Sequence, residues 1–186
     1  LALQKQLEKE KKKELIIEKK LANLAKQEFR SHLVLVDSAS DDKTLSKAKS
    51  WLEDFPEAFE SYKILTMPNR KGKTAAVGLA LDEMSDNQGI IVMTDADATL
   101  MPGSLNRISR WFSNQQVGAV GGTPQRVGIH GQENNHRELY TMLRVGESSH
   151  DSTPFLEGSL LAWRAGLISS SDLYYPSNAD DAQIAT

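Results

Sequence analysis

The sequence has 186 residues, with 22 Lys and Arg, 25 Asp and Glu, 39% hydrophobic residues and no cysteine. This length suits one domain with a substantial core, and the composition excludes a fibrous or wholly disordered chain. No apolar run approaches the roughly 18 residues that a membrane-spanning helix needs. Without cysteine the chain has no disulfide, no thiolate zinc site and no thiol nucleophile, which fits a reducing compartment.

Charge is distributed unevenly along the chain. The formal net charge is −3, but residues 1–30 hold nine basic and five acidic side chains, which leaves 13 basic and 20 acidic ones for the remainder. An acidic body argues against nucleic acid as a partner, because nucleic-acid-binding proteins carry a basic surface. The chain begins at Leu1 and ends at Thr186, shortly after an acidic pair, and we expect it to be a piece of a longer protein.

Residues 1–27 contain neither Gly nor Pro and predict a charged N-terminal helix. Ile17, Leu21 and Leu24 recur at helical spacing and predict one buried face. The segment 8–14 has no apolar residue, so we expect a solvated helix face there rather than a contact with anionic lipid or a partner.

Hydrophobic runs then alternate with helical patterns. Strands are predicted at 32–37, 62–66, 89–94, 117–121 and near 155–163, and helices at about 44–52, 75–81, 102–112 and 133–149. The run 89–94 is apolar at consecutive positions, as buried parallel strands are. Repeats of this kind predict a single α/β domain with a mostly parallel sheet and helices on both faces.

Polar residues follow three of the predicted strands. They are Asp37, the loop 69–73 (NRKGK), and the pair Asp95 and Asp97. Ligands of open α/β sheets bind at the carboxyl ends of the strands, so these groups are expected at one edge. Carboxylate oxygens select Mg²⁺ or Mn²⁺, and a diphosphate would complete the coordination sphere. We favour this metal site over the alternative that the two aspartates only cap a turn.

A second interpretation rests on Gly72, Lys73 and Thr74. A P-loop has the same order of parts, in which a loop that contains this tripeptide connects a strand to a helix. That motif requires an earlier glycine where this chain has Met67, and Pro68 removes one loop amide. A P-loop-like phosphohydrolase is therefore the second candidate, and Asp95 would be the acidic residue on the metal side of its site. A non-catalytic α/β scaffold that associates through the N-terminal helix is the third.

The adjacent carboxylates Asp180 and Asp181 form another acidic cluster. Repulsion between adjacent carboxylates can raise the pKa of one of them, as a general base requires. A solvated tail explains the same residues equally well, and the residues alone leave this choice open.

Six segments, taken together, resemble the inverting family 2 glycosyltransferases, which have the GT-A fold and use nucleotide sugars. In chain order they are VDSASDDKT, NRKGKTAA, IIVMTDADATLMPGSL, VGAVGGTP, FLEGSLLAWRAGL and NADDAQIA. The resemblance covers about residues 14–186. The family opens with an apolar strand that is not found here, so the resemblance implies a GT-A-type sheet whose first strand is missing.

The resemblance implies a role for each matching residue. Asp37 would contact the base or ribose of the donor nucleotide. Lys73 would lie near the nucleotide, with Arg70 beside it. Asp95 and Asp97 resemble the family's DxD motif, in which Asp97 would hold the metal and Asp95 would assist through the ribose or the metal.

Further matches lie in the second part of the chain. Gly158 and Ser159 match a loop that lines the sugar pocket, and Arg164 matches the basic residue that follows it. Asp180 and Asp181 match the family's acidic pair, with Asp181 as catalytic base.

The resemblance also divides the chain into the N-terminal helix (1–27), a nucleotide-binding half (28–123) and a truncated acceptor and catalytic-base half (124–186). Residues 138–147 resemble the membrane-associated polysaccharide-synthase branch and would handle the acceptor.

The implied activity is a metal-dependent, inverting glycosyl transfer with Mn²⁺ or Mg²⁺. Its donor would be a UDP- or GDP-sugar, and its acceptor a hydroxyl of a glycan, polysaccharide or lipid. The expected location is the cytoplasm, or the cytoplasmic face of a membrane that segments outside this chain would contact.

Overall fold

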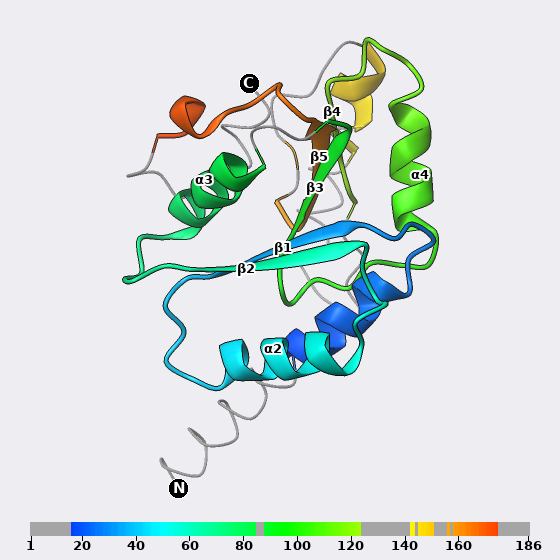
Figure 1. Ribbon diagram of the computed structural model, residues 1–186. Coiled ribbons are helices and arrows are strands. Elements are labelled where there is room, and N and C mark those ends of the chain that lie inside the picture. The colour runs from blue at the N-terminus through cyan, green and yellow to red at the C-terminus, as the bar shows by residue number, and fades with distance from the viewer. Residues whose placement is uncertain are drawn as a thin grey trace, which may run out of the picture.

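The structure is a computed structural model that describes residues 16–84, 88–123, 142–143, 145–150, 156 and 158–174. Its strands form two sheets (Figure 1). β1 (His32–Asp37) and β2 (Ser61–Thr66) form a parallel pair. In the second sheet, β5 (Leu160–Arg164) lies between β3 (Ile90–Thr94) and β4 (Ala119–Gly121), and both neighbours run antiparallel to it. Within the described part of the chain, no helix is long and apolar enough to span a membrane.

Two helices cover one side of the parallel pair. They are the N-terminal helix, described over residues 16–25, and α2 (Thr44–Asp54). Ile17 and Leu21 are 3% and 1% exposed and pack with Leu52 of α2, and Leu24 lies against the same cluster. The apolar stripe predicted for the N-terminal helix is therefore confirmed. Apolar burial of this kind docks a helix onto a sheet without any need for polar contacts.

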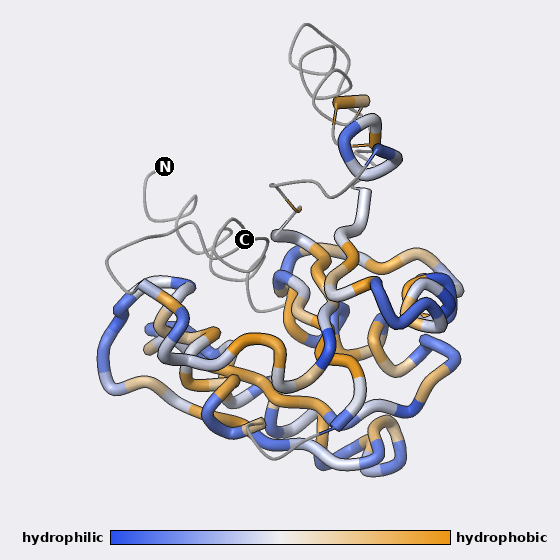
Figure 2. The backbone as a smooth tube through the Cα atoms, turned by 90° about the horizontal axis from the view of Figure 1, so that it is seen from above, coloured by the Kyte–Doolittle hydropathy of each residue, from blue (hydrophilic) through white to orange (hydrophobic). Residues whose placement is uncertain are grey.

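The central strand β5 is covered on both faces because its side chains alternate. Leu161 and Trp163 pack with residues of α3 (Lys73–Glu83), whereas Ala162 packs with residues of α4 (Ser104–Trp111). Successive strand residues point to opposite faces, which produces this division. The two helices accordingly lie on opposite sides of the second sheet (Figure 1). Figure 2 shows hydrophobic segments gathered mainly toward the middle of the domain and hydrophilic segments mainly around its outside.

Two local predictions differ from the structure. β3 was predicted as a buried parallel strand, but among the described residues it pairs on one side only, with antiparallel β5, and leaves Ile90 and Val92 38% and 36% exposed. β1 likewise pairs on one side only, with β2. The helix predicted from Pro102 begins at Ser104, because Gly103 has a left-handed backbone with φ of 74° that a helix cannot contain.

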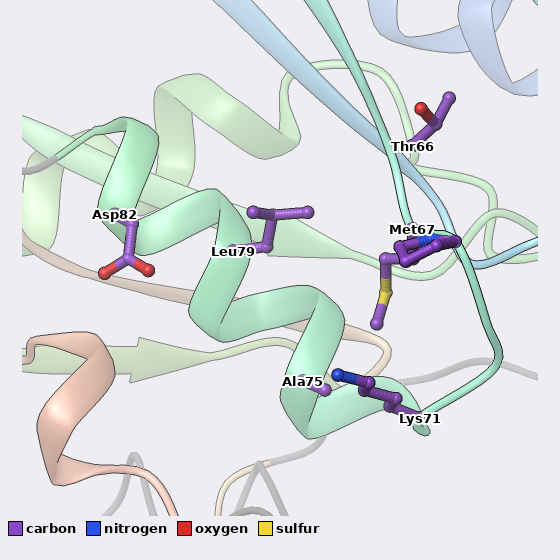
Figure 3. A pocket seen from close by; sticks show the side chains of 7 residues that line it. Thr66, Met67, Lys71, Ala75, Leu79 and Asp82 are labelled. Atoms are coloured by element: carbon purple, nitrogen blue, oxygen red, sulfur yellow. The ribbon is translucent and has the colours of Figure 1, made fainter.

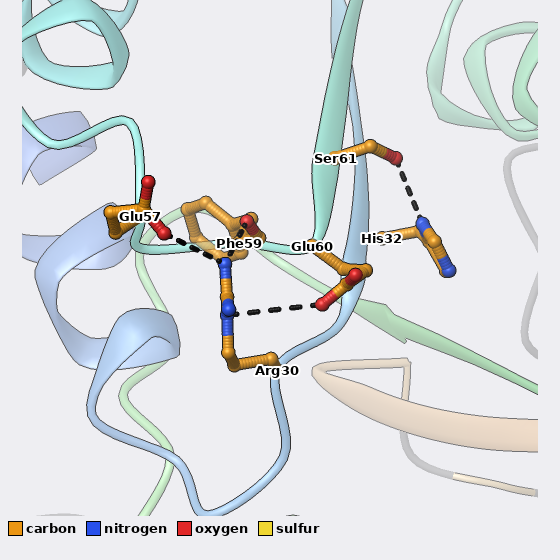
Figure 4. A network of polar contacts seen from close by, with 6 residues as sticks. All are labelled: Arg30, His32, Glu57, Phe59, Glu60 and Ser61. Carbon is orange, nitrogen blue, oxygen red and sulfur yellow. Dashed lines mark hydrogen bonds and ion pairs between the residues drawn. The ribbon is translucent and has the colours of Figure 1, made fainter.

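Exposed polar contacts tie the amino ends of β1 and β2 together (Figure 4). Arg30 donates to the carbonyl oxygen of Phe59 at 3.2 Å and pairs with Glu57 at 3.4 Å. His32 Nδ1 and Ser61 Oγ lie 2.8 Å apart. These contacts stand at the edge opposite the carboxyl ends of the two strands, which leaves that second edge available for a ligand.

Candidate active site

The predicted acidic pair lies in a tight turn directly after β3. The amide of Ala98 donates to the carbonyl oxygen of Asp95 at 3.2 Å, which closes a four-residue turn with Asp97 at its third position. Asp95 is half-buried and Asp97 is exposed. We call residues 94–100 the carboxylate turn, because this segment presents both acids at the end of the strand.

Lys73 approaches the carboxylate turn from the start of α3. Its Nζ lies 2.9 Å from Asp95 Oδ1 and donates to the carbonyl oxygen of Gly158 at 3.3 Å. Gly72, immediately before, has φ of 89° and ψ of 173°, a conformation that is essentially restricted to glycine. The glycine therefore sets the angle at which α3 begins and directs Lys73 toward the acid.

The antiparallel direction of β5 brings its amino end to the same edge. Thr94 Oγ1 donates to the carbonyl oxygen of Ser159 at 2.9 Å, and the amide of Asp95 donates to that same oxygen at 3.4 Å. Lys73 contacts the neighbouring Gly158, as described above. The structure thus assembles Lys73, Asp95, Gly158 and Ser159, which the sequence had predicted separately.

Two residues of this edge were not predicted. Lys20, on the N-terminal helix, is only 6% exposed and donates from Nζ to Thr94 Oγ1 at 2.7 Å and to the carbonyl oxygen of Ala98 at 2.6 Å. Burial lowers the pKa of Lys20 from 10.5 to about 8, and the negative charges of Asp95 and Asp97 partly oppose that shift. Both acids therefore act on one buried ammonium group.

Asn23 follows Lys20 by nearly one helical turn. Its side chain donates to the carbonyl oxygen of Leu100 and accepts from the amide of Leu100, both at 2.8 Å. One sequence signal could have identified this side of the helix: Lys20 falls within the apolar spacing of Ile17, Leu21 and Leu24.

The predicted Asp37 and Arg70 lie together at the ends of β1 and β2. The carboxylate of Asp37 accepts from the amide of Ser40 at 3.3 Å. Arg70 donates to the carbonyl oxygen of Ala39 at 3.2 Å and pairs with Asp41 at 3.0 Å. The side chains of Arg70 and Asp41 are 61% and 80% exposed, so water screens this pair strongly.

An open groove runs beside this loop, between the end of β2 and α3. Figure 3 shows Met67 and Leu79 among the side chains that line it, with Lys71 and Asp82 as charged members. Its lining is mainly apolar.

Arg164 does not join the site. It pairs across the sheet with Ile90, at the amino end of β3, and so stands at the opposite edge from Asp95. Its guanidinium donates to the carbonyl oxygens of Phe112, Asn114 and Val117 at 2.9, 2.9 and 3.0 Å. In the structure the matching basic residue has a structural role, because Arg164 holds the connection from α4 to β4.

Asp180, Asp181 and residues 138–141 lie outside the described residues, as does residue 144 in the predicted acceptor segment. Residues 145–150 are helical, in agreement with the end of the predicted helix.

The carboxylate turn suits a divalent cation in the chemistry of its donors. Asp95 and Asp97 supply hard oxygen ligands, and both lie in the turn that the Ala98 amide closes on the carbonyl oxygen of Asp95. In the part of the chain that the structure describes, no group of three or more His, Cys, Asp or Glu gathers. Two carboxylates leave coordination positions for the oxygens of a diphosphate.

The arrangement is that of an α/β domain with polar and charged groups at the carboxyl ends of its strands. The chain belongs to glycosyltransferase family 2: the family described as "Glycosyl transferase family 2" matches residues 10–172. The comparison with curated proteins finds no match.

Among solved structures, the chain is similar to the mannosyltransferase PcManGT from Pyrobaculum calidifontis in complex with GDP-Man and Mn²⁺. The two share 30% identity with a TM-score of 0.77, over 91% of this chain and 46% of that chain. The chain thus spans about half the length of this relative. These matches confirm the predicted family, the GT-A-type fold and the glycosyltransferase class.

Proposed function

We propose that this domain transfers a sugar from a nucleoside diphosphate sugar to an acceptor hydroxyl, with inversion at the anomeric carbon and with Mn²⁺ or Mg²⁺ as cofactor. The observation that carries the proposal is the convergence of Lys73, Asp95 and the Gly158–Ser159 loop at the end of β3. Membership of family 2 and the relative's complex with GDP-Man and Mn²⁺ support it. The same membership favours glycosyl transfer over the phosphohydrolase and scaffold alternatives.

Asp97 and Asp95 would hold the metal, which when bound supplies positive charge to the departing diphosphate. Lys73 adds a second positive charge at the same place, and its contact with Asp95 keeps that charge at the strand end in the absence of ligand. Asp37, at the end of β1, would contact the base or ribose, and Arg70, in the loop after β2, would lie near the nucleotide.

The general base is predicted from the family resemblance alone. A carboxylate, Asp181 with Asp180 beside it, would accept the proton of the acceptor hydroxyl while the oxygen of that hydroxyl forms a bond to the anomeric carbon. The bond from that carbon to the diphosphate breaks on the opposite face, and the nucleoside diphosphate departs with the electron pair. Inversion follows from this single displacement.

Acceptor and location belong to the same proposal. A glycan, polysaccharide or lipid would supply the hydroxyl, with residues 138–147 involved in its binding. The reaction would take place in the cytoplasm or at the cytoplasmic face of a membrane.

A thermal-shift panel tests the proposal, with UDP, GDP, ADP and ATP, each in Mn²⁺ and in EDTA. A site filled to 100 times its Kd gains roughly 2.7 kcal/mol of stability, which is readily detected in a domain of this size. We expect stabilisation by one diphosphate that depends on Mn²⁺ and disappears in Asp97→Ala. Stabilisation that needs no metal and survives Asp97→Ala would contradict the proposed site.

A further inference from the structure

The N-terminal helix reaches the proposed metal ligands through a buried cation. Lys20 Nζ donates to Thr94 Oγ1 at 2.7 Å and to the carbonyl oxygen of Ala98 at 2.6 Å. Thr94 immediately precedes Asp95, and Ala98 immediately follows Asp97. One ammonium group therefore contacts both sides of the acidic tripeptide.

Asn23 fixes the far end of the same turn. Its amide group exchanges two hydrogen bonds of 2.8 Å with the backbone of Leu100, whose side chain is only 4% exposed. A reciprocal pair of this kind restricts both the position and the orientation of the backbone. Lys20 and Asn23 thus hold the carboxylate turn at both of its ends.

Thr94 extends this network to the opposite side of the site. Its hydroxyl accepts from Lys20 and donates to the carbonyl oxygen of Ser159 at 2.9 Å. The hydroxyl proton is therefore directed away from Lys20 and toward the start of β5. A substitution of Lys20 should consequently change the positions of both Asp95 and Ser159.

These polar contacts are not needed to dock the helix. Ile17 and Leu21 already bury its apolar face against Leu52. Placing a lysine at such a buried position costs free energy, because its charge must leave water. A leucine or methionine would dock the helix equally well, so the lysine calls for another explanation.

We propose that Lys20 and Asn23 are positioning residues of the nucleotide-sugar site, which set the placement of the Asp95 and Asp97 carboxylates by holding residues 94–100. This inference rests on the proposed function. Neither residue needs to touch the donor, since both act through the backbone and hydroxyl groups that they contact.

The test uses the full chain and isothermal titration calorimetry with GDP and with UDP, each in the presence of Mn²⁺. Lys20→Met and Asn23→Leu should weaken metal-dependent binding at least tenfold, and Lys20→Arg should recover part of the loss. Lys19→Met changes an exposed lysine on the same helix and serves as the matched control. Leu52→Ala loosens the core beneath the helix without contacting the carboxylate turn.

Thermal midpoints separate positioning from a structural role. We expect Leu52→Ala to lower the midpoint and to leave the Kd within twofold at temperatures where it is folded. Lys20→Met should keep or raise its midpoint while its Kd rises. A Kd within twofold for both Lys20→Met and Asn23→Leu would overturn the inference, and so would an equal loss in Leu52→Ala. If Lys20→Met does not fold, Asn23→Leu, which changes no charge, decides the question.

Failure of the proposed function would look different. In that case the unsubstituted chain would bind neither diphosphate in Mn²⁺, and the inference would be overturned together with it. Retained binding in every variant would overturn only the positioning role.

Discussion

The carboxyl ends of β1 and β3 both carry acidic and basic side chains, but the two groups are held in different ways. After β1, Arg70 and Asp41 form a pair that is mostly in water. After β3, Lys73 and Asp95 are 39% and 36% exposed, and the nearby Lys20 is buried. The comparison shows that similar residue types at the carboxyl ends of strands can differ greatly in their exposure to water. Of these two groups, the one after β3 is the more enclosed by the fold.

The largest effect is expected from the core beneath the β3 group. Trp163 of β5 is 1% exposed and packs against α3. Trp163→Ala should therefore lower the free energy of unfolding by about 3–5 kcal/mol. Urea denaturation followed by circular dichroism measures this loss. Trp111→Ala removes a side chain that is 63% exposed and should change stability by no more than about 0.5 kcal/mol. Equal losses of unfolding free energy in the two variants would show that the sheet of β3, β4 and β5 has no specifically packed core.

A smaller effect of opposite sign is expected at Lys20. Its folded pKa of about 8 lies below the unfolded value of 10.5, so between these two pH values the unfolded chain binds more protons than the folded one. The free energy of unfolding therefore rises with pH across this window, and below pH 8 the charged lysine destabilises the fold by up to about 3 kcal/mol. Lys20→Met should accordingly be more stable than the unsubstituted chain at pH 7.

Denaturation at pH 7 and at pH 10 checks this prediction. The advantage of Lys20→Met should shrink at the higher pH, whereas Lys19→Met should show no such dependence because Lys19 is exposed. A marked loss of stability in Lys20→Met at pH 7 would mean that the hydrogen bonds of Lys20 outweigh the cost of its burial.

The smallest effects compare the two ion pairs directly. Double-mutant cycles should give a coupling of about 0.5–1 kcal/mol for Lys73 with Asp95, and about 0–0.3 kcal/mol for Arg70 with Asp41, because exposure screens the second pair more. One cycle combines Lys73→Met with Asp95→Asn, and the other combines Arg70→Met with Asp41→Asn. Urea denaturation at low salt and in 1 M NaCl measures the free energy of unfolding of each variant. Stronger coupling in the Arg70 pair would reverse the comparison.

The positions of strands were predictable where the hydrophobic pattern of a short segment identifies them. The run 32–37 was predicted with the bounds that β1 has, and the predicted strand at 62–66 differs from β2 by one residue. Alternating and continuous apolar residues report burial directly, and short polar segments mark the ends. The predicted division of the chain at residues 27 and 123 stays a prediction.

Strand pairing was less accessible to sequence analysis. β5 is separated from β3 by more than 60 residues, and its antiparallel insertion between β3 and β4 depends on long-range packing. The apolar run of β3 fits a parallel strand and an antiparallel one equally well. For the same reason Gly158 and Ser159 could be linked to Asp95 only through a family resemblance, and not from their spacing.

Lys20 was missed because it follows the charged residues Glu18 and Lys19, although its spacing from Ile17 and Leu24 places it on the apolar side of the helix. In a helix with many solvated lysines, no composition rule distinguishes the one whose ammonium is buried. Its partners, Thr94 and Ala98, are known only once the helix is docked. Arg164 shows the converse case, since it matches a family residue in sequence but supports the loop between α4 and β4 in the fold.

The contacts of the N-terminal helix with the carboxylate turn also bear on the order in which the chain folds. They join residues separated by 74 to 78 positions, whereas β1, α2 and β2 find their partners within about half that distance. Closing a longer loop costs more chain entropy, and contacts of large sequence separation form more slowly. We therefore expect the first half to gain its native structure early and the carboxylate turn to become ordered late, as one of the last cooperative steps.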